Sequence, residues 1–358
     1  MKRVIISLCA AVGLAAVGAA SAQNEVSRPC PNPVSIKGFK TCADVKKAEE
    51  EGEIVLYSPD VEQGTVKVLQ GFKAAFPKIN TKYVRLQTGA LYSKLMAERQ
   101  AKTYLVDVVN LSDVGLALDF QKRGGWQPYL SPEMAAYDPR FKSKPEGLFT
   151  WGCMIMAGIA YNPATTSAAD APKDWSDLTD PKWQGGISVK SANSGLQHNT
   201  WFVLRKLLGD DFWTRFATQK PRAFDSYVEQ YDRLSNREDK LAVTAQYSGY
   251  LEFKVKGAPL VFVAPTSGLP AGPEVIGLAK NAPHPEAARL FLDWFLSPIG
   301  QKVNADALFN YSARTDVEPP PGGIPMSQMK LLVPDDWDAY VASRKDFVQL
   351  WGKLSGLR

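Results

Sequence analysis

The chain has 358 residues, of which 45% are hydrophobic, and its 42 Lys and Arg against 37 Asp and Glu give a formal net charge of +5. That length is enough for two domains, each with its own core. Basic and acidic residues are interspersed rather than clustered, so the electrostatic pattern of a nucleic-acid-binding or membrane-surface protein is missing.

The N-terminal segment has the pattern of an export signal. Lys2 and Arg3 precede an apolar run over residues 4–17, and Ala20-Ser21-Ala22 supplies the small side chains that signal peptidase accepts. We therefore expect residues 1–22 to be a cleaved signal peptide and the mature protein to be periplasmic. No later stretch approaches the roughly 18 uninterrupted apolar residues that a transmembrane helix needs.

An N-terminal extension over residues 23–51 contains two of the four cysteines. Cys30 and Cys42 bracket a loop that contains Pro and Gly, and an exported protein enters an oxidising compartment, so we expect them to form a disulfide. Cys153 lies in the apolar run TWGCMIMAGIAY and is expected to be an inert buried thiol.

The next part of the chain alternates between strand and helix patterns. Glu53–Tyr57 and Lys82–Leu86 are typical of strands, and between them apolar residues recur at helical spacing. A helix at Leu91–Gln100 and a strand at Tyr104–Asn110 follow. This β-α-β-α-β order predicts a mostly parallel sheet with helices on both faces.

The same order returns later, with a strand at Gly186–Lys190, a helix at Gln197–Leu208 and a strand at Leu241–Gln246. Two α/β lobes are therefore predicted. We expect the chain to cross between them at 148–161 and at 261–268. One lobe would then comprise residues 52–155 plus 266–318, and the other residues 156–265 plus 319–358.

Two helices are expected in the last third of the chain. Pro285 is suited to the first position of a helix, and Glu286 lies in the first turn, where the helix dipole favours a negative charge. Helical material over Trp337–Leu354 follows a proline-rich link, and we expect it to pack on the second lobe.

Open α/β sheets bind ligands beyond the carboxyl ends of their strands, so the site is expected in the cleft between the lobes. Four loops lie at such strand ends: Tyr57–Asp60, Asn110–Asp113, Ser191–Gly195 and Gln246–Tyr250.

The third loop is the most informative. Ser191-Ala192-Asn193-Ser194-Gly195 leads from a strand into a helix, whose free backbone amides and positive dipole end suit a phosphate, a carboxylate or a similar oxyanion. The alternative is a simple helix cap by Asn193 or Ser194.

From about Gly52 onward, the chain resembles the ferric-ion-binding branch of bacterial periplasmic solute-binding proteins of ABC transporters. The resemblance depends on the tract Pro265–Val303, the strand ending in Ala160-Tyr161-Asn162, the tract Trp175–Trp183 and the Ser194-Gly195 turn. It implies an α/β two-lobe fold of the type II periplasmic-binding class, which captures a solute by hinge closure and delivers it to a membrane permease and its cytoplasmic ATPase. No catalysis, no cofactor and a monomer are implied.

The iron-binding pattern itself is mostly absent. Relatives that hold Fe(III) use two consecutive tyrosines, often with a histidine and a glutamate, whereas this chain has Tyr247-Ser248 and retains only Tyr247. That set is too sparse to hold Fe(III) tightly, so iron is an alternative reading, with Tyr247 as the candidate metal ligand. The retained amide-rich turn favours a small organic anion: a phosphorylated, phosphonate or carboxylate compound.

Further side chains are assigned to this site. Tyr57, Tyr247 and Tyr250 offer stacking or hydroxyl groups, and Arg314 is suited to clamp an oxyanion. The alternative for the three tyrosines is packing in the core, and the alternative for Arg314 is exposure at the surface. The full set of candidate ligand-binding residues is Tyr57, Ser58, Asp60, Ser112, Asp113, Asn193, Ser194, Gly195, Leu196, His198, Asp225, Tyr247, Ser248, Tyr250 and Arg314.

Three acidic residues in this set, Asp60, Asp113 and Asp225, would oppose an anion unless they cap helices. If they face the ligand instead, an amine-bearing solute such as thiamine, a polyamine or an aminophosphonate becomes an alternative.

A periplasmic hydrolase is the remaining alternative. Ser194 and His198 would have to act as nucleophile and base, but the sequence around them supplies neither an orienting carboxylate nor a Gly-x-Ser-x-Gly elbow. We therefore expect His198 to contact the ligand or cap its helix, and His284 to lie at the surface.

Overall fold

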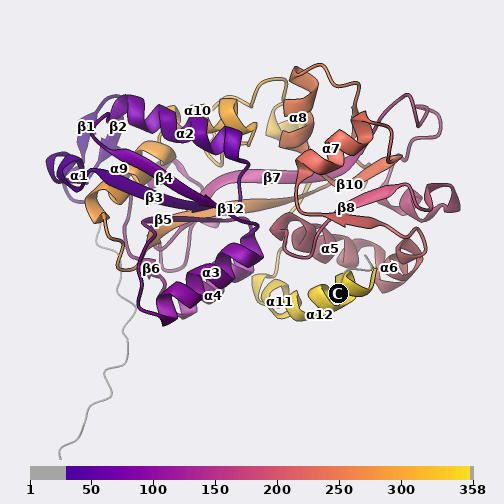
Figure 1. The fold of residues 1–358 in the computed structure, drawn as a ribbon, viewed down its shortest axis with the longest axis horizontal. Coiled ribbons are helices and arrows are strands. Elements are labelled where there is room, and N and C mark those ends of the chain that lie inside the picture. Colours follow the sequence, from indigo (N-terminus) through magenta and orange to yellow (C-terminus); the bar gives the residue numbers. More distant parts are fainter. Residues whose placement is uncertain (1–29, 355–358) are drawn as a thin grey trace, which may run out of the picture.

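The computed structural model describes residues 30–354, and the predicted signal peptide lies outside them. Figure 1 shows a group of strands and helices at each end of the molecule, joined by two long strands, β7 (Thr150–Tyr161) and β12 (Leu269–Ala279). Every residue of both strands is buried. They pair antiparallel, from Ala271 opposite Met156 to Ile276 opposite Thr150, so one continuous sheet connects the lobes.

The first lobe is built on three parallel strands in the order β4-β3-β5, extended by the antiparallel strand β12. Its core includes Phe72, whose ring lies 5.1 Å from that of Phe291 and 5.5 Å from that of Trp294. Its elements are β3 (Glu53–Ser58), α2 (Glu62–Ala75), β4 (Asn80–Arg85), α3 (Thr88–Gln100), β5 (Val108–Leu111), α4 (Val114–Lys122), β6 (Trp126–Gln127), α9 (Pro285–Leu296) and α10 (Pro298–Leu308).

The second lobe repeats this plan. Strands β10, β8 and β9 are parallel, and β7 pairs antiparallel with β10 and with β11. Trp201 and Trp213 lie in its separate core. Its elements are β8 (Ile187–Lys190), α5 (Gly195–Leu208), α6 (Asp210–Ala217), β9 (Arg222–Phe224), α7 (Tyr227–Ser235), β10 (Leu241–Gln246), α8 (Tyr247–Val255) and β11 (Val261–Val263).

The C-terminal segment touches both lobes. It runs through β13 (Leu331–Leu332) into α11 (Trp337–Ala342) and α12 (Arg344–Leu354), which lie beside α5 in Figure 1. Phe347 and Trp351 of α12 are buried in the second core. Tyr340 of α11, in contrast, packs between His198 of the second lobe and Gly115 of α4 in the first.

Short 3₁₀ helices occur in the connections: Pro132–Ala136, Pro139–Phe141, Trp175–Thr179, Pro181–Trp183 and Met326–Gln328. No helix between residues 30 and 354 is long and apolar enough to cross a membrane.

The predicted α/β fold with a parallel sheet in each lobe is confirmed, but the second crossing lies further along the chain than expected. We expected it at 261–268, whereas residues 261–263 form β11 at the edge of the second lobe and the long strand begins at Leu269. The first part of this strand was not predicted because it contains Pro270 and Pro273. Proline cannot donate a hydrogen bond to a neighbouring strand and therefore argues against a central strand.

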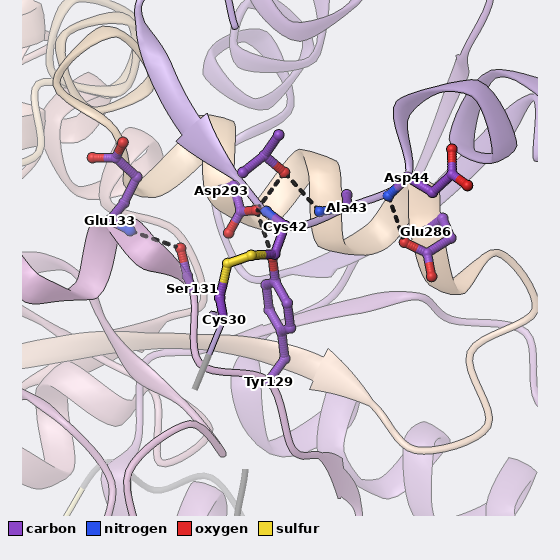
Figure 2. Close-up of a disulfide and its surroundings, with 10 residues drawn as sticks. Cys30, Cys42, Ala43, Asp44, Tyr129, Ser131, Glu133, Glu286 and Asp293 are labelled. Atoms are coloured by element: carbon purple, nitrogen blue, oxygen red, sulfur yellow. Dashed lines mark hydrogen bonds between the residues drawn. A yellow bond between two sulfur atoms is a disulfide. The ribbon is translucent and has the colours of Figure 1, made fainter. Parts of the chain in front are cut away.

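The N-terminal extension is attached to the first lobe. It forms a hairpin of β1 (Val34–Ile36) and β2 (Phe39–Thr41), followed by α1 (Val45–Glu51). Cys30 and Cys42 form a disulfide, the expected pairing, with their Cα atoms 5.9 Å apart. Figure 2 shows Asp293 of α9 beside it, accepting hydrogen bonds from the Cys42 amide (3.3 Å) and the Tyr129 hydroxyl (2.6 Å).

Candidate functional site

The carboxyl ends of the parallel strands in both lobes face one space, which we call the cleft pocket. Residues at or just after the ends of β3, β4 and β5, and at the end of α10, line it from the first lobe. Residues at or just after the ends of β8, β9 and β10 line it from the second, while β7 and β12 contribute one side chain each. This is the position where open α/β sheets bind ligands. The lining residues are Pro59, Asp60, Val61, Arg85, Gln87, Ser112, Ile155, Lys190, Ser194, Leu196, Ser226, Tyr227, Gln246, Glu274, Leu308 and Asn310.

The cleft pocket is narrow in this structure. Its volume is about 30 Å³, and it shares Val61, Arg85 and Ser226 with the lining of a neighbouring groove of about 940 Å³. Beside the pocket the lobes touch, because a methyl group added to Gly195 would overlap the carbonyl oxygen of Ser112. About 30 Å³ is room for roughly two water molecules, so a larger solute enters only if the lobes separate.

Two cationic side chains from opposite lobes line the pocket. Arg85 ends β4, and its buried Nε has no hydrogen-bond partner among the described residues. Lys190 ends β8, and its Nζ lies 3.2 Å from the backbone oxygen of Asp225. Within residues 30–354, neither makes an ion pair of 4 Å or less with a carboxylate. Burial, and then the charge of Arg85, lower the pKa of Lys190 to about 7.

Two carboxyl groups lie at the base of the pocket. Asp60 follows β3 and Glu274 belongs to β12, and the two groups are within hydrogen-bonding reach of each other. Asn110 Nδ2 donates to both, at 3.1 Å to Asp60 and 3.3 Å to Glu274. Burial, followed by the charge of its neighbour, raises the pKa of Glu274 well above its usual value. Burial also raises the pKa of Asp60, so the neutral form of both carboxyl groups is favoured relative to that of exposed ones.

Three helices begin at the pocket without a side-chain cap. Val61, Gln87 and Gln246 are the N-cap residues of α2, α3 and α8, and none of their side chains accepts a hydrogen bond from the first turn. Free amides and the positive end of the helix dipole at such positions favour an anion. This arrangement, together with Arg85 and Lys190, makes the pocket suited to oxyanion binding.

Four of the candidate residues line the pocket: Asp60, Ser112, Ser194 and Leu196. Ser194 also caps α5, since its Oγ accepts from the Gln197 amide at 3.3 Å. Asn193 and Gly195 lie at the contact between the lobes instead, where the Asn193 carbonyl accepts from the Gly89 amide at 3.3 Å.

Tyr57 and Ser58 lie behind the pocket. The Tyr57 hydroxyl donates to Glu98 at 3.0 Å, so the stacking role expected for this ring does not fit its position. Ser58 Oγ donates to Asp60 at 3.0 Å and thereby orients that carboxyl group.

Asp113 and His198 meet each other rather than a ligand. Asp113 caps α4 and pairs with Arg344 of the C-terminal segment, and its Oδ2 lies 3.5 Å from His198 Nδ1. Burial acts to raise the pKa of Asp113, but Arg344 and His198 outweigh it and lower the pKa to about 2. His198 is buried against Tyr340 and Phe347. The capping alternative therefore describes Asp113.

The residues at the start of α8 form an aromatic cluster outside the pocket lining. Tyr247 packs on Phe262, with ring centroids 4.7 Å apart, and stacks on Tyr250 and Tyr311. Ser248 accepts from the Gln246 side chain at 2.9 Å. Between residues 30 and 354, no group of three or more His, Cys, Asp or Glu side chains is arranged to hold a metal ion.

Two further expectations need correction. Arg314 does not reach the pocket, because its buried guanidinium pairs with Glu133 at 3.1 Å and with Asp316 at 2.7 Å and donates to the Leu296 carbonyl. Asp225 has an exposed side chain and contributes its backbone oxygen to Lys190. Arg314 stabilises the fold of the first lobe rather than clamping a solute.

Three charged or titratable residues of the pocket, Arg85, Lys190 and Glu274, are absent from the predicted set of site residues. Lys190 ends a predicted strand and Arg85 is the penultimate residue of another, so the rule that ligands bind beyond strand ends already pointed to this region, but the prediction included only the polar loops. Glu274 begins the expected strand EVIGLAK, and no local pattern indicates that it meets Asp60.

Comparisons with known proteins agree with this geometry. A family model described as bacterial extracellular solute-binding protein matches residues 105–330. The probable ABC transporter periplasmic-binding protein y4fP of Sinorhizobium fredii is 26% identical over 321 residues, which cover 83% of this chain and 84% of that protein.

Two solved structures are similar over most of the chain. The periplasmic binding protein AfuA from Actinobacillus pleuropneumoniae, with exogenous fructose-6-phosphate bound, gives a TM-score of 0.76 at 22% identity and covers 86% of this chain and 99% of its own. Iron-bound HitA from Pseudomonas aeruginosa gives 0.73 at 19% identity, covering 84% and 99%. At these identities they establish the two-lobe type II fold.

Proposed function

The chain belongs to the bacterial extracellular solute-binding protein family, and we propose on that basis that it is the periplasmic receptor of an ABC importer for a small organic anion. The preferred solute carries a phosphate, phosphonate or carboxylate group. A membrane permease and its cytoplasmic ATPase are the proposed partners, and the solute is delivered without chemical change.

One observation carries the choice of an anion: Arg85 and Lys190 extend from opposite lobes into one pocket, where the buried Arg85 Nε has no hydrogen-bond partner in the described chain and Lys190 Nζ donates to a backbone oxygen. Each positive charge disfavours the other, which lowers the pKa of Lys190 further than burial alone. An oxyanion between them removes that repulsion and forms charge-assisted hydrogen bonds.

The two cations come from different lobes, and this supports capture by closure. The solute first binds to one lobe, and its charge then attracts the cation of the other lobe as the hinge strands β7 and β12 bend. The small volume of the pocket, about 30 Å³, is consistent with a form in which the lobes are together. Water is then excluded, which strengthens the ion pairs.

The iron alternative is disfavoured by the same charges. A trivalent cation at this pocket would lie near Arg85 and Lys190, and Tyr247, the expected iron ligand, packs against Phe262 outside the pocket lining. AfuA, the similar protein with a bound sugar phosphate, supports a phosphorylated solute as the first class to test.

Calorimetric titration of the mature protein with matched solutes tests the proposal. Glucose 6-phosphate, gluconate, glucose, spermidine and ferric citrate form a suitable panel. We expect saturable binding of one of the organic anions and none of glucose or spermidine, with the anion recovered unchanged after denaturation of the complex. Binding of spermidine or of iron without an organic anion would contradict the proposal, as would turnover of the solute.

A further inference from the structure

The C-terminal segment joins the two lobes at a place that the proposed anion site does not use. Helix α12 is anchored in the second lobe, because Phe347 and Trp351 are buried in its core and Trp351 Nε1 donates to the Lys190 carbonyl at 2.9 Å. Helix α11 instead lies against α4 of the first lobe (Figure 1), where Tyr340 packs over Gly115. A separation of the lobes therefore has to break one of these two contacts.

An ion pair crosses between the lobes beside these helices. Arg344, the first residue of α12, pairs with Asp113 of the first lobe, and its Nη2 donates to the Ala192 carbonyl of the second lobe at 3.3 Å. Asp113 caps α4 and is thereby fixed to the first lobe. Arg344 therefore links the turn after β5 to the turn after β8, and these two turns carry the pocket residues Ser112 and Ser194.

A histidine also faces Asp113 from the second lobe. His198 of α5 is fully buried; its Nδ1 lies 3.5 Å from Asp113 Oδ2, and its Nε2 lies 3.0 Å from Ser343 Oγ. Its ring packs on that of Tyr340, with centroids 4.2 Å apart. Burial lowers the pKa of His198, so the imidazole is mainly neutral at neutral pH and Arg344 supplies the positive charge that faces Asp113.

The burial of Asp113 makes this ion pair important for the position of the lobes. The residue is 1% exposed, and a buried carboxylate that loses its partner is strongly unfavourable. In an open form, where α4 no longer contacts α11, water hydrates the same carboxylate and it needs no partner. Loss of the charge of Arg344 therefore raises the free energy of the closed form more than that of the open form.

We propose that Asp113 and Arg344 form a latch between the lobes, which stabilises their closed arrangement independently of the solute. The C-terminal segment supplies one half of the latch from the second lobe, and α4 supplies the other half from the first. This role goes beyond the proposed function, because it depends on the two-lobe fold and not on the chemistry of the solute. Asp113 and Arg344 are positioning residues and do not contact the solute.

The distance between the lobes tests the latch directly. Ser93 on α3 and Thr214 on α6 are exposed positions in the first and the second lobe. Ser93→Cys and Thr214→Cys accept spin labels selectively, because the native cysteines of the described chain are a disulfide and a buried thiol. Double electron–electron resonance is measured on this labelled parent protein, freed of solute by unfolding in guanidinium chloride, dialysis and refolding. We expect one main distance, which corresponds to the closed form.

Substitutions in the labelled parent assign the closed form to the ion pair. Arg344→Met leaves Asp113 buried and unpaired, so a longer distance should appear and the ratio of closed to open molecules should fall at least about tenfold. Adding Asp113→Asn removes the unpaired charge while asparagine still caps α4, so the ratio should return to within about threefold of the parent. Lys345→Met, at the exposed neighbouring position, should leave the distribution unchanged. Circular dichroism and thermal unfolding verify the fold of each variant.

Four results would overturn the latch. They are an unchanged distance distribution in Arg344→Met, a double variant that is as open as Arg344→Met, a parent protein in which the longer distance already predominates, and an equal shift in Lys345→Met. If Arg344→Met does not fold, Arg344→Gln gives the same test with a side chain that can still donate to the Ala192 carbonyl. None of these results bears on anion binding, which the titration of the solute panel tests separately.

Discussion

Lys190 makes anion binding depend on pH in a way that can be calculated. Burial and the charge of Arg85 lower its pKa from 10.5 to about 7, so near pH 7 about half of the ligand-free molecules carry a neutral amine at this position. A bound oxyanion favours the ammonium form and raises the pKa. Binding therefore takes up a proton, and affinity is highest where Lys190 is already charged.

The proton uptake and the change in affinity can be calculated for an anion that restores the pKa of Lys190 to its ordinary value of 10.5. Proton uptake per bound anion is then about 0.1 at pH 6 and about 0.9 at pH 8, and affinity falls about ninefold from pH 8 to pH 9. Below pH 6 the affinity is nearly constant. The sign is fixed because the complex binds more protons than the free protein, so raising the pH opposes binding.

Calorimetry in buffers with different ionisation enthalpies measures this uptake. Lys190→Arg is the matched control, since arginine keeps its charge over the whole range. The protonation of the ligand itself changes both affinities by the same factor, so it has no effect on the ratio of wild-type to variant affinity. We expect the ratio to fall about ninefold between pH 8 and pH 9. A ratio that stays constant over this interval would refute the assignment of Lys190 to the anion site.

Three further predictions concern single features of the structure. Arg85→Ala should weaken anion binding by about 10- to 100-fold, the size of a lost charge-assisted hydrogen bond, whereas Lys82→Ala at an exposed position of the same strand should leave calorimetric affinity unchanged. Equal losses of anion affinity in both variants would show that the overall positive charge of this region attracts the anion, rather than a contact with Arg85. Arg314→Ala leaves a buried carboxylate without its partner and should lower the free energy of unfolding by about 3–5 kcal/mol in urea titrations. Its anion affinity should not change; a large loss would restore Arg314 as a ligand-binding residue. Replacing Cys30 and Cys42 by serine opens a loop with a sequence separation of 12 residues and should cost about 3 kcal/mol by chain entropy, measured in the same way; unaltered stability would contradict this.

The fold could be predicted because its signals are local. The residues at helical spacing between the first two predicted strands lie on α2 and, for Phe76, at its C-cap, and the run around Cys153 is the fully buried strand β7. Only the second part of strand β12 was predicted, because Pro270 and Pro273 in its first part are unfavourable in the middle of a sheet.

The candidate site was less predictable because its contacts join distant parts of the chain. Asp60 and Ser194 were found from their positions in strand-end loops. Arg314 was misplaced because its partner Glu133 is remote in sequence, and nothing near Arg314 indicates a buried ion pair. Glu274 was missed for the same reason, since its closeness to Asp60 is a property of the assembled sheet.

Native mass spectrometry of the protein, purified without denaturation from the cells that produce it, tests the central claim most directly. We expect a bound mass that corresponds to one organic anion, which is absent from a variant in which Arg85 and Lys190 are replaced by Ala and Met. A bound solute that is neutral, cationic or metallic, or one that the double variant retains in full, would contradict the account.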